Sequence, residues 1–344
     1  MLIPMKDRRI TLIGGAGFIG HNLALELKSK GADVHIIDGL QVNNLGSVNI
    51  NEHDLPNNDL YLAVLNERLD LLRAAGIPVH VQDARDYHAL SRLLSELKPQ
   101  VVVQLAAVSH ANRSNKDPHS TFDHSLRTLE NALDSVRKYA EHFLFMSSSM
   151  VYGNFETDIV DENSNCNPIG IYGALKFSGE KIVTAYNQVF DLPYTIIRPS
   201  ALYGERCISR RVGQIFIEHA ILGQQITVNG DGSDKLDFTY IKDLVDGISK
   251  CIENPNSYNE IFNLTFGNAR SISEMLGILG EHFPNINVNY VPKDKLMPER
   301  GTLSGDKARQ LLDYTPQHKL DTGYVDYINW YKEFITEHPD LLGK

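Results

Sequence analysis

Short apolar runs recur along the first 200 residues of the chain, and the stretches between them carry apolar residues at helical spacing. Runs of this length are typical of strands in a sheet that is covered on both faces, and spacing of three to four residues is typical of amphipathic helices. Alternation of the two patterns predicts an α/β fold whose sheet is parallel and doubly wound. The strands are expected at residues 10–13, 34–37, 79–82, 101–105, 142–146 and 194–197.

The first helix of this alternation follows a turn that is dense in glycine. Gly14, Gly17 and Gly20 stand three residues apart, directly after the first strand. The first glycine permits a sharp turn, the second leaves room for a pyrophosphate near the main chain, and the third lets the helix lie close to the strand. The unpaired amides and the positive dipole end of the helix would face the phosphates. The segment therefore predicts dinucleotide binding by a Rossmann-type fold.

Asp38 closes this unit at the end of the second strand. A carboxylate there can accept hydrogen bonds from a ribose diol and would repel a 2′-phosphate. We therefore expect NAD rather than NADP. Three glycines beside a helix can also form a simple packing turn, but here they follow a strand and the acid stands at the expected distance.

Residues 39–78 lack the regular alternation of their neighbours. Polar and turn-forming residues dominate as far as Leu60, and helical spacing then continues to a terminal glycine, Gly76. We interpret the segment as a loop followed by a helix. It is either a surface elaboration or an insertion that shapes a lid or a subunit contact.

The pattern changes at about residue 200 to shorter strands and helices with turns between them. A chain of 344 residues can bury the core of one large domain and still form a smaller lobe. We expect a dinucleotide-binding domain over residues 1–200 and mainly a substrate lobe of α/β type over residues 201–344. Segments at about 236–262 are candidates for a return to the first domain.

Composition argues against several kinds of partner. A formal charge of −10 with no basic block argues against nucleic acid. The apolar runs are strand-sized and the first residues lack the apolar core of a secretion signal, so we expect a cytoplasmic protein without a membrane span. The unpaired spacing of Cys166, Cys207 and Cys251 indicates free thiols, and we expect no metal site.

Tyr172 and Lys176, four residues apart, predict catalytic chemistry. On a helix these positions share a face, and an ammonium beside a phenol would lower the pKa of the phenol from roughly 10 toward neutrality. Serine hydroxyls at the end of the 142–146 strand could bond the same substrate oxygen. The phenolate could then take a proton from an alcohol while the carbon gives hydride to a nicotinamide. The alternative is an exposed pair on a solvated helix.

These motifs together resemble the extended short-chain dehydrogenase/reductase family, and in particular its nucleotide-sugar epimerases and dehydratases of the UDP-glucose 4-epimerase type. The resemblance implies bound NAD, a nucleotide-diphosphate sugar as substrate, and a homodimer formed through helices near residues 118–139 and 170–190. The cofactor contacts that it implies are Gly14, Gly17, Phe18, Ile19, Gly20, Asp38, Asp83, Ala84, Leu105, Ala106, Ala107, Tyr172, Lys176, Arg198 and Pro199.

Asp83 resembles the family aspartate that hydrogen-bonds the adenine amino group. The alternative is a cap for the helix that begins near Tyr87. One carboxylate could serve only one of these roles well, and we favour the adenine contact.

The family pattern also assigns the catalytic serine. Counting back from Val-Tyr-Gly places the active hydroxyl at Ser148. Ser149 and Met150 then stand where the 4,6-dehydratases carry Asp and Glu for the elimination of water. Methionine cannot move a proton. The sequence therefore favours oxidation at C4 followed by re-reduction from the other face over dehydration or decarboxylation.

The contacts to the substrate depart from the family pattern at two positions. Ala201 and Leu236 replace an asparagine and an arginine that reach the substrate diphosphate. Two phosphates need a cationic partner, so other basic residues must compensate, although each could instead be a solvated surface cation or loop residue. The substrate-binding residues that we expect are Ser109, His110, Arg113, Ser149, Arg211, Lys235 and Arg300.

The sequence thus predicts an NAD-dependent nucleotide-sugar epimerase that inverts C4 through a transient 4-keto sugar. Ser148 would orient the substrate, Tyr172 would act as base and then as acid, and Lys176 would tune Tyr172. The alternatives are a nucleotide-sugar dehydrogenase or reductase that consumes NAD(H), and a decarboxylase or dehydratase of the same family. A cofactor-sensing protein without enzymatic activity would be expected to lack the Tyr/Lys pair.

Overall fold

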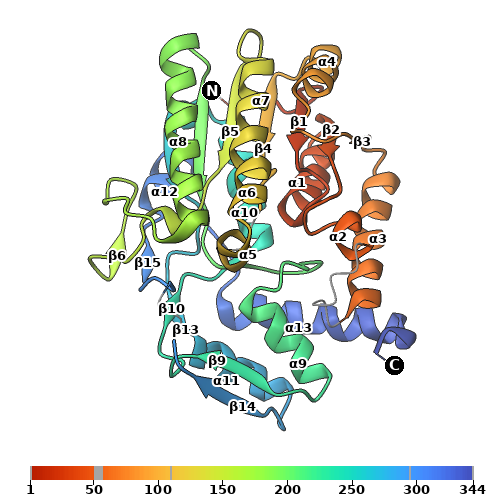
Figure 1. Ribbon diagram of the computed structural model, residues 1–344, viewed down its shortest axis with the longest axis vertical. Helices are drawn as coiled ribbons and strands as arrows, with labels where there is room; N and C mark the ends of the chain where they lie inside the picture. The colour runs from red at the N-terminus through yellow and green to blue at the C-terminus, as the bar shows by residue number, and fades with distance from the viewer. Residues whose placement is uncertain (1, 50–56, 109–110, 294–295, 343–344) are drawn as a thin grey trace.

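A parallel sheet of seven strands lies at the centre of the computed structural model, which describes residues 2–49, 57–108, 111–293 and 296–342 (Figure 1). Neighbouring strands follow the order β12-β7-β5-β4-β1-β2-β3, so the order reverses between β1 and β4. This confirms the predicted Rossmann-type fold, whose ligands bind outside the carboxyl ends of the strands at such a reversal. The strands are β1 (Arg9–Ile13), β2 (Asp33–Asp38), β3 (Val79–Val81), β4 (Val101–Gln104), β5 (His142–Met146), β7 (Tyr194–Arg198) and β12 (Glu260–Asn263).

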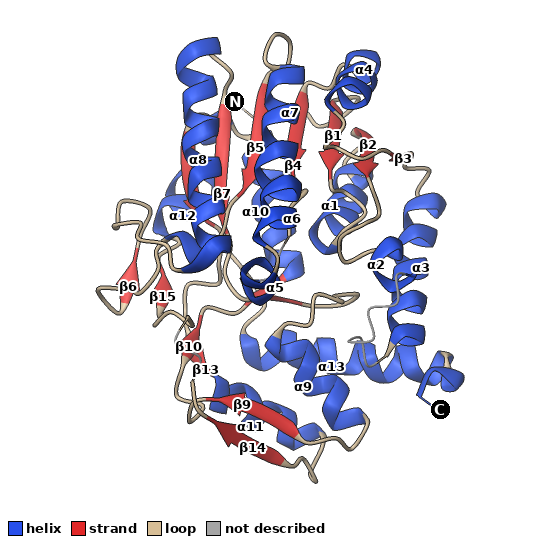
Figure 2. Cartoon of the chain, in the orientation of Figure 1, coloured by secondary structure: helices blue, strands red, loops and turns tan. Residues whose placement is uncertain are grey.

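Each face of the sheet has its own apolar core, because successive residues of a strand point to opposite sides. Ile10 and Leu12 pack into one core, whereas Ile13 of the same strand packs into the other. Helices therefore cover both faces, as Figure 2 shows. The first core includes α1 (Phe18–Ser29) and α10 (Ile241–Glu253), and the second includes α4 (Tyr87–Leu97), α7 (Thr128–Val136) and α8 (Gly170–Phe190).

The helix that we expected near residues 118–139 is interrupted. It is divided into α6 (Pro118–Phe122), one π-helical turn (Asp123–Arg127) and α7, which ends at Val136. The carboxylate of Asp117 caps α6 by accepting a hydrogen bond from the amide of Ser120 at 3.0 Å. A regular pattern of apolar residues cannot reveal a local change of helical pitch.

The chain leaves the central sheet after β7 and returns to it at β12. β12 pairs in parallel with β7, and α10 packs against α1. The division of the domains at residue 200 stays a prediction. The lobe in the lower part of Figure 1 holds α9 (Val212–Ile221), α11 (Ile272–His282), α13 (Leu320–Glu337), β9 (Ile226–Asn229) and β14 (Val288–Val291).

Shorter elements connect these two parts of the molecule. They form two-stranded pairs between β8 (Leu202–Tyr203) and β11 (Thr239–Tyr240), between β10 (Lys235–Leu236) and β13 (Arg270–Ser271), and between β6 (Ile159–Val160) and β15 (Thr302–Leu303). The remaining α-helices are α2 (Leu45–Asn49), α3 (Asn58–Ala74), α5 (Ala111–Lys116) and α12 (Asp306–Leu312).

The insertion between β2 and β3 is packed into the molecule rather than added to its surface. Its helix α3 contacts α1 and buries Leu60, Val64 and Leu72 on one face. From the same helix, the hydroxyl of Tyr61 donates a hydrogen bond to the carboxylate of Glu218 on α9, 2.8 Å away. The insertion thus joins the Rossmann-type part to the lobe below it, so the interpretation as a surface elaboration is wrong.

The cysteines are free thiols, as predicted, with Cys207 and Cys251 buried and Cys166 half-buried. Within the ranges that the structure describes, every helix is too short or too polar to cross a membrane.

Candidate active site

The glycine turn between β1 and α1 has the close approaches that its sequence predicts. Gly14 has a φ of +79°, and a Cβ there would stand 2.5 Å from the amide nitrogen of Ala106. A Cβ on Gly20 would stand 2.4 Å from the carbonyl oxygen of Gly15. Neither position can hold a larger residue without a shift of the main chain. The turn therefore keeps the helix start close to the sheet, where a diphosphate can reach its amides.

A cavity of about 130 Å³ opens beside this turn, where the strand order reverses. A dinucleotide fits this cavity, because the cavity wall combines the start of α1 with Asp38, an acid at the end of β2. The predicted cofactor residues on this wall are Gly14, Gly17, Phe18, Ile19, Gly20, Asp38, Asp83, Ala84, Leu105, Ala106 and Ala107.

Asp38 also fastens the glycine turn to β2. Its carboxylate accepts hydrogen bonds from the amide of Ala16 at 2.9 Å and from the amide of Leu40 at 2.8 Å. Burial raises the pKa of Asp38, and these two hydrogen bonds oppose that rise. Asp38 thus lines the cavity as predicted and has a second, structural role that the sequence did not indicate.

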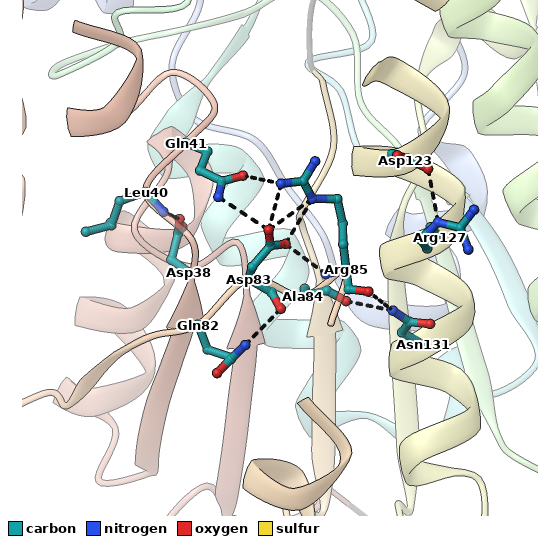
Figure 3. Close-up of polar contacts among 10 residues, drawn as sticks. All are labelled: Asp38, Leu40, Gln41, Gln82, Asp83, Ala84, Arg85, Asp123, Arg127 and Asn131. Atoms are coloured by element: carbon teal, nitrogen blue, oxygen red, sulfur yellow. Dashed lines mark hydrogen bonds and ion pairs between the residues drawn. The ribbon is translucent and has the colours of Figure 1, made fainter. Parts of the chain in front are cut away.

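Asp83 is not the cap of the following helix. The carboxylate of Asp86 has that role, because it accepts a hydrogen bond from the amide of Ala89 at 3.0 Å. Asp83 instead pairs with Arg85 at 2.7 Å and accepts a hydrogen bond from Gln41 at 3.3 Å (Figure 3). Burial alone would raise the pKa of Asp83, but the hydrogen bonds from Arg85 lower it. The cap is excluded, and the adenine contact stays a prediction.

The catalytic residues predicted from the sequence lie together on the wall of a second, larger cavity of about 420 Å³. Ser148 follows the end of β5, and α8 carries both Tyr172 and Lys176. The hydroxyl of Ser148 lies near enough to Tyr172 to lower the pKa of its phenol. Ile19 and Leu105 line both cavities. The cavity that holds Ser148, Tyr172 and Lys176 therefore adjoins the cavity beside the glycine turn.

Lys176 is buried and tied to the main chain. Its Nζ donates a hydrogen bond to the carbonyl oxygen of Met146 at 2.7 Å and lies 5.9 Å from the ring centroid of Tyr172. Burial lowers the pKa of Lys176 to about 8, although the negative charge of Glu180 acts in the opposite direction. The ammonium can therefore lose its proton in a moderately alkaline solution.

The prediction that the pKa of Tyr172 falls toward neutrality is wrong. Burial raises the pKa of this phenol, and the charge of Arg211 and the hydrogen bond from Ser148 reduce the rise without reversing it. The cation whose charge opposes this rise is Arg211. Lys176 shares the helix face as expected, but its ammonium is held by the carbonyl of Met146.

Arg198 lines neither cavity, so the cofactor contact expected for it stays a prediction. It is buried and paired with Glu180 at 2.7 Å, and it donates a further hydrogen bond to the hydroxyl of Tyr152 at 3.0 Å. Pro199, the next residue, does line the larger cavity. Sequence reasoning missed Glu180, although its place one helical turn after Lys176 on the same face was a usable signal.

Two arginines with unpaired nitrogen atoms line the larger cavity. The Nε atoms of Arg211 and Arg300 are buried without a hydrogen-bond partner in the described part of the chain. Burial, and then the charge of Arg211, lower the pKa of Arg300 to about 10. Arg300 lines only the larger cavity, whereas Arg211 lines both. Both side chains are half-buried, and a cation whose buried donor has no partner favours an anionic ligand.

The other predicted substrate residues are placed unevenly. Ser149 and Lys235 line the larger cavity, Ser149 buried and Lys235 exposed. Arg113 lines neither cavity, whereas Asn112 and Asn115 of the same helix line the larger one. Ser109 and His110 lie outside the described residues.

The match to a family model decides what kind of protein this is. The NAD dependent epimerase/dehydratase family model matches residues 10–265. The chain belongs to this family. It is therefore an enzyme of an NAD-dependent family, and the fit of its glycine turn to a dinucleotide agrees with that cofactor.

Several known proteins resemble this family member along almost their whole length. An uncharacterized UDP-glucose epimerase of Bacillus subtilis, YtcB, is 29% identical over 325 residues, which cover 93% of this chain and 96% of that protein. A dTDP-glucose 4,6-dehydratase of Xanthomonas campestris is 26% identical, with 92% of this chain and 91% of the relative covered. The fold of UDP-glucuronic acid 4-epimerase from Bacillus cereus, solved with UDP-glucuronic acid and NAD, matches with a TM-score of 0.83 at 24% identity, over 94% of this chain and 99% of that one.

Proposed function

We propose that this enzyme is a nucleotide-sugar epimerase that inverts C4 of its substrate through a transient 4-keto sugar. The observation that carries the proposal is one cavity wall that combines Ser148, Tyr172 and Lys176 with Met150. The first three can move a proton on and off a C4 hydroxyl. A thioether at the fourth position supplies neither an acid nor a base, which elimination of water would require.

Tyr172 is the group that we assign to this proton transfer. Its closeness to Ser148 on the same cavity wall supports a shared substrate oxygen, to which both hydroxyls would be directed. Since burial keeps the phenol protonated, cationic charge is needed to form the phenolate, and Arg211 is the residue whose charge acts in that direction. NAD, when bound, supplies a hydride acceptor for C4 and returns the hydride.

Arg211 and Arg300 support a nucleotide diphosphate as the anionic part of the substrate. Both have a buried, unpaired Nε, and planar guanidinium groups suit phosphate oxygens. They would compensate for Ala201 and Leu236, which stand on the same wall without a charge. UDP-glucose and UDP-glucuronic acid, which occur in the names of similar proteins, are the first compounds to test.

The test is incubation of the purified protein with a panel of nucleotide sugars without added cofactor, followed by NMR. We expect a product inverted at C4 and no net change in NAD(H). Tyr172→Phe should lower turnover by roughly 10²- to 10⁴-fold while NAD stays bound. Tyr186→Phe, on the same helix but lining neither cavity, is the matched control and should keep full activity. Full activity in the Tyr172 variant would refute the assignment.

Dehydration is the second candidate reaction, because the similarity to a dTDP-glucose 4,6-dehydratase covers 92% of the chain. A 4-keto-6-deoxy product in the same NMR experiment would favour this reaction. Stoichiometric consumption of added NAD(H) would instead identify a dehydrogenase or reductase.

We also propose a homodimer formed through the region of α6, α7 and α8. Large apolar side chains are exposed there, with 46% of Phe122, 69% of Val189 and 40% of Phe190 accessible to solvent. A second copy of the chain would cover them. Light scattering should give twice the mass of the chain, and Val189→Asp should shift the mass toward that of a monomer.

A further inference from the structure

Arg68 is a cation in an unusual place. It lies on the buried face of α3, in the insertion between β2 and β3, and only 1% of it is exposed. Buried positions of such a helix normally carry apolar side chains, as Val64 and Leu72 do here. Full burial excludes the ordinary role of a solvated surface arginine.

The guanidinium of Arg68 is fixed on one side and unpaired on the other. Nε donates a hydrogen bond to the carbonyl oxygen of Arg206 at 2.9 Å, and Nη2 donates to the same oxygen. Nη1 is buried and has no hydrogen-bond partner in the described part of the chain. The group is therefore held in one orientation with one nitrogen left for a ligand.

Arg68 forms part of the wall of the smaller cavity, together with Gly14, Gly17 and Asp38. Gly17 is the N-cap residue of α1, and this helix start has neither a side-chain cap nor an acidic residue in its first turn. The amides of the helix start and the arginine thus present positive charge to the same cavity.

The described residues supply little negative charge to balance Arg68. Asp38 is the carboxylate whose charge acts on it, but both oxygens of Asp38 accept main-chain hydrogen bonds and form no ion pair with Arg68. Glu67 pairs with Arg206 at 3.2 Å. A buried cation that lacks a paired anion is costly, and a ligand with phosphate oxygens would relieve that cost.

We propose that Arg68 is a ligand of the diphosphate of the dinucleotide cofactor, supplied by the inserted helix α3. Nucleotide sugars carry the same chemical group, so the two sources must be distinguished. Arg68 lines only the smaller cavity, whereas Arg300 lines only the larger one. The assignment of Arg68 to the dinucleotide rests on this difference.

The test compares ligands with and without a diphosphate. Dissociation constants of NAD, ADP, adenosine and UDP are measured by calorimetry on the purified protein, and the NAD that purifies with each variant is quantified. Arg68→Met removes the charge and keeps much of the volume. We expect NAD and ADP to bind about 10- to 100-fold more weakly, with adenosine and UDP changed by less than about threefold.

Controls distinguish two roles of Arg68: binding of a phosphate, and structural support of the main chain at Arg206. Arg73→Met removes an arginine of the same helix whose side chain is 78% exposed, and it should leave all four constants unchanged. Equal weakening of adenosine and NAD in the Arg68 variant would mean that Arg68 only supports the fold, and weakening of UDP alone would assign it to the substrate. An NAD constant within threefold of wild type would also overturn the proposal.

If the methionine variant does not fold, Arg68→Lys carries the test. A lysine keeps the charge but cannot bond Arg206 and a phosphate through one rigid fork. We expect it to bind NAD severalfold more weakly and adenosine normally. Unchanged NAD binding in a folded lysine variant would contradict the need for the guanidinium.

Discussion

The ammonium of Lys176 is hydrogen-bonded to the carbonyl oxygen of Met146 at 2.7 Å, so it joins helix α8 to the end of β5. Ser148 follows the same strand two residues later. This single contact therefore links the two elements that carry Ser148 and Tyr172, the hydroxyls to which we assign the proton transfer. The ammonium of Lys176 is also buried, and its pKa of about 8 lies close to the physiological range.

The pH dependence of activity should report this burial. The pKa of Lys176 is lowered to about 8, so its positive charge is present below that pH and lost as the pH rises through it. We expect kcat/KM to fall by about tenfold per pH unit above pH ~8. Lys176→Arg, whose side chain stays charged to above pH ~12, should have lower activity but no decline near pH 8. A wild-type profile that stays flat to pH 10 would contradict the prediction.

The buried pair of Glu180 and Arg198 should contribute strongly to stability. Both side chains are only 3% exposed, so Glu180→Gln leaves a buried guanidinium without its counter-charge. We expect the free energy of unfolding to fall by about 3–5 kcal/mol in denaturant titrations. Asp70→Asn, which breaks a surface pair with Arg73, should cost less than about 1 kcal/mol. Equal effects of the two substitutions would show that the buried pair has no special importance.

Gly20→Ala should impair the cofactor site. The new Cβ would lie 2.4 Å from the carbonyl oxygen of Gly15, so the turn would have to move away from α1. We expect NAD to bind at least about tenfold more weakly, measured by calorimetry. Gly277→Ala is a matched control, because this exposed glycine of α11 has nothing within 4 Å of the added atom. Normal NAD binding by the Gly20 variant would show that the turn adapts.

Arg300 and Arg211 should differ in which ligand they affect. Arg300→Met is expected to raise the KM for the nucleotide sugar by about 10- to 100-fold and to leave NAD binding unchanged, since Arg300 lines only the larger cavity. Arg211→Met is expected to weaken both ligands, because Arg211 lines both cavities. Lys235→Met should have the smallest effect, as this side chain is exposed. Steady-state kinetics and calorimetry measure the two effects separately. Weaker NAD binding in the Arg300 variant would contradict this division.

The sequence predicted those features that depend on local periodicity and on short motifs. The strands β1 to β5 and β7 follow from apolar runs, and the cavity of the glycine turn lies where its motif indicates. These features depend on neighbours within one turn or one strand. The pattern of consecutive residues is therefore enough to predict them.

Features that depend on distant partners could not be predicted in this way. Nothing within reach of Arg198 in the sequence reveals that it pairs with Glu180, and the burial that raises the pKa of Tyr172 depends on distant segments that line the same cavity. Arg68 is a similar case, because a single arginine in an apolar helix pattern reads as a surface residue until the packing of α3 is known.

Arg211 stands on the wall between the two cavities and belongs to both. A dinucleotide in one cavity and a sugar nucleotide in the other are both negatively charged, and both would interact with the guanidinium group of Arg211. Thermodynamic linkage then makes their interaction reciprocal: whatever factor the dinucleotide imposes on the affinity of the sugar nucleotide, the sugar nucleotide imposes on the affinity of the dinucleotide.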